Sequence, residues 1–216
     1  MFLSKKTPLV AIDMGSHSIK LVQLAQLKNG SFELVSLGMM PLEQGSIVEG
    51  AIKDPGQVAE ALANLVKAEK IQSNFVVASV SGEAVFVKKI KVPEMSEEEL
   101  SKKITEEAEQ YIPFDINDVA LDYQILEKVN GTASEPEEQE KKSSDEDGED
   151  QDSSMVEALL VAVQRDVIDE RTDVLLEAGL KPAIIDLDVF ALMNAARLNK
   201  DLTAMGATAL IDLGDS

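Results

Sequence analysis

The fold is decided by the stretch VAIDMGSHSIK, residues 10–20, in which an apolar run meets an aspartate and then a glycine. The pattern returns far along the sequence as ALIDLGD, residues 209–215. A single Asp-x-Gly triplet is common in turns and predicts little on its own. Two copies, each directly after an apolar run that is typical of a buried strand, predict a duplicated strand-and-turn unit.

The chemistry of the repeated triplet favours a phosphate ligand. Glycine lets the backbone approach a ligand closely, so that successive N–H groups can donate to phosphate oxygens. An aspartate at the end of a strand can hold Mg²⁺ through water, because Mg²⁺ keeps most of its hydration shell. The two copies therefore predict a site for a phosphate ligand with Mg²⁺, and Asp13 is the expected metal-site residue.

The first copy is the fuller one, and it resembles the first phosphate loop of the superfamily that contains actin, chaperones and sugar kinases. The resemblance implies that Asp13 orients the hydration shell of Mg²⁺. The implied contacts to the phosphates of ATP are the backbone amides of Gly15, Ser16 and His17, the hydroxyl of Ser18 and the ammonium of Lys20. Lys20 as a solvated strand residue stays open as an alternative. We expect His17, the one histidine of the chain, to be a turn residue rather than a catalytic imidazole.

The second copy is expected to begin the second phosphate loop. By the same resemblance, Asp212 is the catalytic acid that positions water or metal, and Gly214 contributes to cofactor binding. Because the sequence ends two residues after Gly214, we expect it to be a fragment that lacks the adenosine pocket. Asp188 stands where relatives often carry an acidic residue that faces the cleft, although a helix N-cap explains it equally well.

Hydrophobic periodicity divides the sequence into an α/β unit and an insertion. Strands are predicted at residues 9–13, 18–24 and 32–37, before a helix that begins after the N-cap Asp54. The middle of the chain gives strand, helix, strand, strand, helix, and its last helix covers 166–178.

These elements predict three subdomains. The first subdomain is expected to consist of residues 1–83 together with 182–205, and the inserted subdomain lies between them at 84–181. A second actin-like subdomain is expected to begin at 206–216, with a buried strand at 207–212.

An acidic segment interrupts the inserted unit. Residues 135–152 carry ten acidic residues and two lysines, with no Ala, Val, Ile, Leu, Met or aromatic residue. Burial cannot offset the entropy of ordering such a segment, so we predict a disordered loop over 131–154. A docking segment for a basic partner is the alternative. The net charge of −20 argues against nucleic acid as a partner, because the chain repels a phosphate backbone.

The composition and the N-terminal sequence indicate the cellular compartment of the protein. The chain has no cysteine and one histidine, which excludes a disulfide framework and argues against a structural zinc site. The apolar run near the N-terminus is cut by Asp13 and is too short for a signal peptide or a membrane span. We therefore expect a cytoplasmic protein.

Several longer stretches resemble the PilM family of bacterial type IV pilus assembly proteins. They are KTPLVAIDMGSHSIKLVQL at 6–24, EEAEQYIPF at 106–114, DVALDYQIL at 118–126 and LLEAGLKPA at 175–183. The resemblance implies an α/β fold of the actin-like ATPase (ribonuclease H-like) class. It implies the first half of that fold only, with an inserted βαββα subdomain as in the cell-division protein FtsA.

The same resemblance implies a function. ATP and Mg²⁺ would be bound with weak or no ATPase activity. The short cytoplasmic N-terminal peptide of PilN would dock in a groove between the first subdomain and the insertion. Other pilus assembly proteins would be further partners, and the protein would lie at the inner membrane, attached indirectly through PilN.

Three related classes stay open as alternatives. An FtsA-like filament protein of cell division shares the subdomain plan, and so does the cytoplasmic domain of a type II secretion GspL protein. A sugar- or acetate-type kinase shares the phosphate loops. A kinase is not expected to carry the YIPF element at 111–114 or the inserted subdomain.

Overall fold

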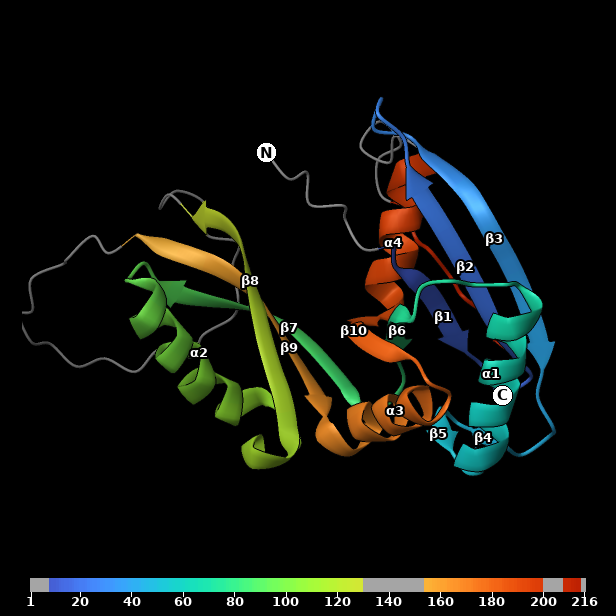
Figure 1. The fold of residues 1–216 in the computed structure, drawn as a ribbon. Coiled ribbons are helices and arrows are strands. Elements are labelled where there is room, and N and C mark those ends of the chain that lie inside the picture. The colour runs from blue at the N-terminus through green and yellow to red at the C-terminus, as the bar shows by residue number, and fades with distance from the viewer. Residues whose placement is uncertain (1–7, 130–153, 200–207, 215–216) are drawn as a thin grey trace, which may run out of the picture. The chain divides into compact units, whose positions relative to one another are not determined.

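The computed structural model describes residues 8–129, 154–199 and 208–214. The chain forms two compact units (Figure 1). The first unit is made of Met1–Val85 and Arg165–Ser216, and the second of Phe86–Gln164. The predicted disordered loop at 131–154 lies almost wholly outside the described residues.

The first unit is built on a five-stranded mixed sheet with the strand order β10-β6-β1-β2-β3. Its strands are β1 (Val10–Met14), β2 (Ser18–Gln26), β3 (Phe32–Pro41), β6 (Phe75–Val80) and β10 (Lys181–Leu187). Its helices are α1 (Pro55–Ala68), α3 (Arg165–Glu177) and α4 (Asp188–Asn199). A small hairpin, β4 (Ile47–Val48) and β5 (Ala51–Ile52), lies between β3 and α1 in the sequence. β1 is antiparallel to β2 and parallel to β6, and β10 is parallel to β6.

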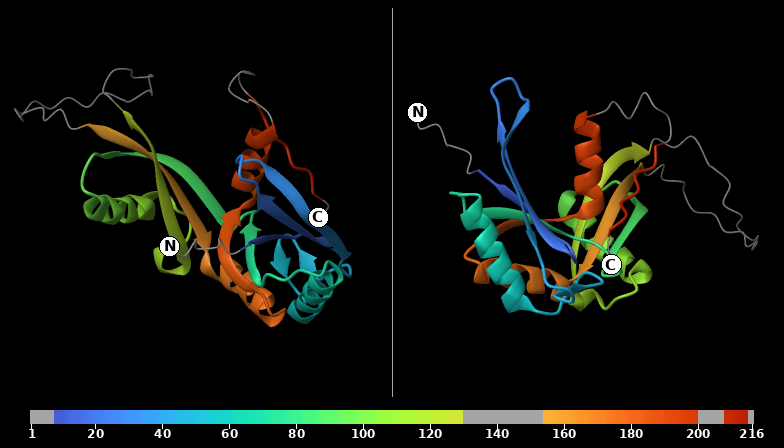
Figure 2. Two further views of the ribbon diagram at one scale, coloured as in Figure 1. Left: turned by 45° about the horizontal axis from the view of Figure 1, so that its top comes forward. Right: turned by 90° about the vertical axis from the view of Figure 1, so that its right-hand side faces the viewer.

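The side chains of β1 alternate between the core and the opposite face of the sheet. Val10, Ile12 and Met14 are buried, whereas Ala11 and Asp13 are exposed. Successive strand residues point to opposite faces, so the aspartate lies on the face away from the core. α1 lies over one face of the sheet and α4 over the other (Figure 2).

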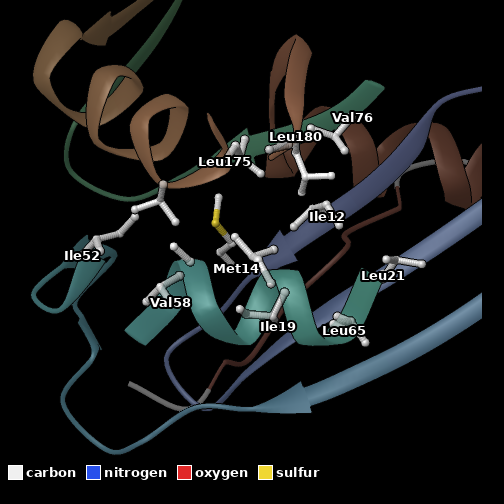
Figure 3. Close-up of a cluster of buried hydrophobic side chains, with 14 of the residues drawn as sticks. Ile12, Met14, Ile19, Leu21, Ile52, Val58, Leu65, Val76, Leu175 and Leu180 are labelled. Atoms are coloured by element: carbon white, nitrogen blue, oxygen red, sulfur yellow. The ribbon is translucent and has the colours of Figure 1, made fainter. Parts of the chain in front are cut away.

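The core of the first unit lies between the sheet and the helices α1 and α3 (Figure 3). α1 begins after Asp54, whose side chain accepts a hydrogen bond of 3.0 Å from the N–H of Gln57. Its buried face carries Val58, Leu62 and Leu65, which pack with the buried residues of β1, β2 and β6. Within the described ranges, no helix is both long and apolar enough to cross a membrane.

The second unit is a three-stranded sheet with the order β7-β9-β8 and one long helix. Its elements are β7 (Val85–Pro93), α2 (Glu97–Tyr111), the 3₁₀ turn Ile116–Asp118, β8 (Val119–Val129) and β9 (Met155–Gln164). The helix opens with a capping box between Ser96 and Glu99. It buries Leu100, Ile104 and Ala108 in a core that is separate from that of the first unit.

The second unit is shorter than the insertion predicted at 84–181. The predicted helix at 166–178 corresponds to α3, which belongs to the first unit. The reason is packing: Val174 and Leu175 on α3 are buried in the same core as α1 and β6. The second unit therefore has the order βαββ, without the second helix that the sequence assigned to it.

The predicted buried strand at 207–212 is not formed in its described part. Residues 208–214 have no strand assignment, and Ile211 and Leu213 are 77% and 89% exposed. A strand needs a hydrogen-bonded neighbour, and β1 finds one in β2, which follows its glycine turn.

Candidate functional site

The loop between β1 and β2 borders a pocket of about 400 Å³ in the first unit. All eight residues that the sequence nominates line this pocket, namely Asp13, Gly15, Ser16, His17, Ser18, Lys20, Asp212 and Gly214. The two copies of the Asp-x-Gly pattern, far apart in the sequence, thus border one space. Their contacts with ATP and Mg²⁺ stay predictions.

The turn between β1 and β2 is held by its own backbone. The N–H of Gly15 donates to the carbonyl of Ser18 at 3.1 Å. A Cβ at position 15 would lie 3.3 Å from that oxygen, so the turn favours glycine there. The Gly15 amide is engaged within the turn in this conformation. Its contact with a phosphate stays a prediction. The carbonyl of His17 accepts a bond of 2.9 Å from the N–H of Leu42, which fixes the loop to the end of β3.

Lys20 and Asp13 face each other across the hairpin. They are paired in the register of β1 and β2, and Lys20 Nζ lies 2.9 Å from Asp13 Oδ2. The hydrogen bond to Asp13, and attraction to that carboxylate, raise the pKa of Lys20 above its ordinary value. Asp212 and Asp188 add smaller contributions in the same direction. One lysine thus lies in the field of three carboxylates, which it cannot neutralise alone.

The carboxylates suit a hydrated cation rather than a closed metal cage. In the portion of the chain that the structure describes, no group of three or more His, Cys, Asp or Glu side chains could hold a metal ion by itself. Mg²⁺ at nucleotide sites is bound by one or two carboxylates, water and phosphate oxygens. Asp13 at the end of β1 fits that arrangement. Asp188 is the first residue of α4 and also lines the pocket.

Of the other pocket residues that were not predicted from the sequence, four are polar residues or glycine. Ser79 and Ser81 stand at the carboxyl end of β6, and Gly50 joins β4 to β5. The sequence did hold a signal for the serines, because ligands of α/β proteins gather beyond the carboxyl ends of strands. Arg171 is the fourth. Arg171 lies three and four residues before Val174 and Leu175, which places it on the apolar face of the helix. A charged residue at such a position is the sequence feature that could have indicated its role.

Comparison with known proteins agrees with this architecture. The chain matches a family model described as type IV pilus assembly protein PilM over residues 11–141 and 147–216. It is similar to a solved chain of the PilM–PilN type IV pilus biogenesis complex, with 25% identity and a TM-score of 0.69. The match covers 86% of this chain and 49% of that one, so the chain spans about half the length of this relative.

Two further solved structures are more distant. The cytoplasmic domain of EpsL, an inner-membrane component of the type II secretion system of Vibrio cholerae, has 14% identity and a TM-score of 0.49 over 86% of this chain and 59% of that one. A Bacteroides thetaiotaomicron protein with an actin-like ATPase fold has 8% identity and a TM-score of 0.36 over 89% and 56%. The α/β, actin-like fold class predicted from the sequence is confirmed. The chain belongs to the family of type IV pilus assembly proteins PilM.

Proposed function

We propose that this protein is an ATP-binding scaffold of the type IV pilus inner-membrane assembly complex. The observation that carries the proposal is the family match over 11–141 and 147–216. The similar solved chain comes from a complex of PilM with PilN. The proposed partner is accordingly the cytoplasmic N-terminal peptide of PilN, which the scaffold links to the pilus motor.

The pocket supports nucleotide binding by this scaffold. It is lined by two cationic residues, Lys20 and Arg171, and by the serines at positions 16, 18, 79 and 81. These groups are suited to phosphate oxygens. When bound, Mg²⁺ supplies positive charge that offsets the repulsion between the phosphates and the carboxylates of the pocket. Asp13 is the residue proposed to hold its hydration shell.

We propose binding with weak or no turnover. Asp212 would position any attacking water, and ATP would act mainly as a bound ligand. The proposed location is the cytoplasm, at the inner membrane, with indirect attachment through PilN and contacts with other assembly proteins. The net charge of −20 supports an indirect attachment, because anionic lipid surfaces repel an acidic protein.

A peptide titration tests the scaffold function. A fluorescent peptide with the sequence of the PilN cytoplasmic N-terminus is titrated with the full-length protein, and anisotropy is measured with and without ATP and Mg²⁺. We expect saturable binding, because an extended peptide in a groove gains backbone hydrogen bonds and apolar anchor contacts. A scrambled peptide of the same composition is the control, since it keeps the charge and loses the order of the anchors.

The outcomes separate the related classes. Binding of the native peptide alone supports the scaffold. Equal affinity for both peptides overturns the proposed PilN docking and leaves the family assignment intact. Polymerisation on lipid vesicles would instead indicate an FtsA-like function, and rapid ATP turnover on a small acceptor would indicate a kinase.

A further inference from the structure

Arg171 is an unusual residue for its position in the fold. It lies in the middle of α3, and its side chain is only 3% exposed. Within the described ranges it is the one charged residue that is buried; the other buried polar residue is Ser46. A buried charge is costly unless it is paired and hydrogen-bonded, so its contacts need an explanation.

Two of the three guanidinium nitrogens are tied to backbone. Nε donates to the carbonyl of Ser79 at 3.1 Å, and Nη1 donates to the carbonyl of Gly50 at 3.1 Å. These bonds connect α3 to the carboxyl end of β6 and to the β4–β5 hairpin. Nη2 donates to no residue that the structure describes, and no carboxylate in those ranges forms an ion pair with Arg171. The guanidinium therefore retains N–H groups, those of Nη2, that can donate to a ligand.

The charge of Arg171 is poorly compensated where it lies. Burial lowers the pKa of the guanidinium, and the more distant carboxylates of Asp188, Glu170 and Asp13 offset only some of that effect. The carboxylates of Asp13 and Asp188 attract both Arg171 and Lys20. Two cations from different elements, α3 and β2, are thus attracted by the same pair of carboxylates and line the same pocket.

Guanidinium chemistry indicates which ligand would complete this arrangement. A guanidinium is planar, always charged and presents donors in a fork that matches phosphate oxygens. Charge-assisted hydrogen bonds of this kind are the strong ones. A phosphate bound at the Asp13–Lys20 loop would lie in the pocket that Arg171 also lines. In the described residues, no carboxylate forms an ion pair with Arg171 and competes for its remaining donors.

We propose that Arg171 is a second phosphate-binding cation of this pocket, whose Nη2 donates to a phosphate group of the bound nucleotide. This rests on the proposed nucleotide function. Nε and Nη1 hold the guanidinium in place by their bonds to Ser79 and Gly50, so the phosphate-binding donor is preorganised. Bound phosphate is then linked through one side chain to α3, β6 and the β4–β5 hairpin.

Calorimetry on the full-length protein tests the assignment. Arg171→Gln removes the charge, Arg171→Lys keeps it without the fork, and Arg165→Gln is a matched control at an exposed arginine of the same helix. For ATP with Mg²⁺ we expect Arg171→Gln to bind roughly ten- to a hundred-fold more weakly than wild type. Arg171→Lys should lose less affinity, and Arg165→Gln should bind as wild type does. With Arg171→Gln, affinity should also depend less steeply on salt, because one charge contact is lost.

The readout separates ligand binding from a merely structural role. A structural role would lower the melting temperature of Arg171→Gln and leave the ATP affinity and salt dependence of the folded protein unchanged, which overturns the proposal. If Arg171→Gln does not fold, the ATP affinity of Arg171→Lys tests the proposal. A single ammonium cannot donate to both carbonyls and to a phosphate, so this variant should bind ATP more weakly than wild type. Wild-type affinity in Arg171→Lys also overturns the proposal. Wild-type protein that binds neither ATP nor inorganic pyrophosphate overturns the nucleotide function together with this proposal.

Discussion

Lys20 Nζ lies 2.9 Å from Asp13 Oδ2, and the two residues are direct partners across the β1–β2 hairpin. Their side chains are 55% and 53% exposed, and an ion pair this accessible contributes at most about 1 kcal/mol to stability. An entering phosphate can therefore replace Asp13 as the partner of Lys20. The released carboxylate is then available to a hydrated Mg²⁺ ion.

This exchange predicts that both residues support nucleotide binding. Lys20→Ala and Asp13→Ala should each bind ATP with Mg²⁺ roughly ten- to a hundred-fold more weakly, because a charge-assisted contact contributes about 1.5–3 kcal/mol. Isothermal calorimetry of the full-length variants measures the effect. Removal of Mg²⁺ with a chelator should narrow the difference between wild type and Asp13→Ala, because Asp13 is proposed to act through the metal.

Lys28 provides a matched control for this prediction. It is an exposed lysine just beyond the end of β2 and does not line the pocket. Lys28→Ala should therefore bind ATP as wild type does. Wild-type affinity in both pocket variants would contradict the phosphate-loop assignment.

The acidic segment should be dispensable for folding. Replacement of residues 135–152 by a short turn should leave the melting temperature of the protein nearly unchanged. β8 and β9 are antiparallel, and Val129 is paired with Met155, so the strand ends that flank the segment are already adjacent. A shorter loop changes the closure entropy only slightly. A drop of more than a few degrees, measured by thermal unfolding, would show that the segment contributes to the packed structure.

Local signals made much of the candidate site predictable. The signal of a strand that ends in Asp-x-Gly spans only a few consecutive residues, so it can be recognised without knowledge of the tertiary structure. The alternation of side chains along this strand places Asp13 on the face opposite the core. The eight nominated residues line one pocket because the two copies of this signal border the same space. Arg171 lay outside the prediction, because its importance depends on carbonyls of Ser79 and Gly50 that are distant in the sequence.

The differences between the predicted and the observed elements have the same physical origin. The amphipathic pattern of α3 predicts a helix with a buried face, but it does not identify the core that this face meets. Val174 and Leu175 meet the core of the first unit, so α3 groups with that unit, whereas the sequence placed it in the insertion that ends at residue 181. The apolar run at 207–212 likewise predicts burial and cannot supply the neighbouring strand that burial requires.

The assignment of α3 to the first unit can be tested by two adjacent leucines. Leu175 is fully buried in the core of that unit, whereas its neighbour Leu176 is 53% exposed. Leu175→Ala should lower the free energy of unfolding by about 2–5 kcal/mol, because it leaves a cavity among tightly packed side chains. Leu176→Ala is the matched control and should have little effect. Equal losses in both variants, measured by denaturant unfolding, would contradict the placement of α3.

The capping box of α2 predicts a pH-dependent contribution to the stability of the second unit. Glu99 Oε2 accepts hydrogen bonds from the Ser96 hydroxyl at 2.6 Å and from the Ser96 N–H at 3.2 Å. These bonds favour the charged carboxylate and lower the pKa of Glu99 below its ordinary value of 4.5. A lowered pKa in the folded state means that this stabilisation is present above the unfolded pKa and is lost as the pH falls through the folded one.

Two variants separate the cap from its charge. Ser96→Ala should destabilise the second unit by about 1 kcal/mol at neutral pH, because α2 loses its N-cap. Glu99→Gln should remove the share of the acid dependence that comes from this carboxylate. Its melting temperature should therefore fall less steeply than that of wild type as the pH drops below the ordinary glutamate pKa of 4.5. Glu97→Gln, in the same helical turn but outside the capping box, is the control. If Glu97→Gln and Glu99→Gln flatten the acid dependence equally, the effect comes from general charge near the helix N-terminus and not from the bonds between Glu99 and Ser96.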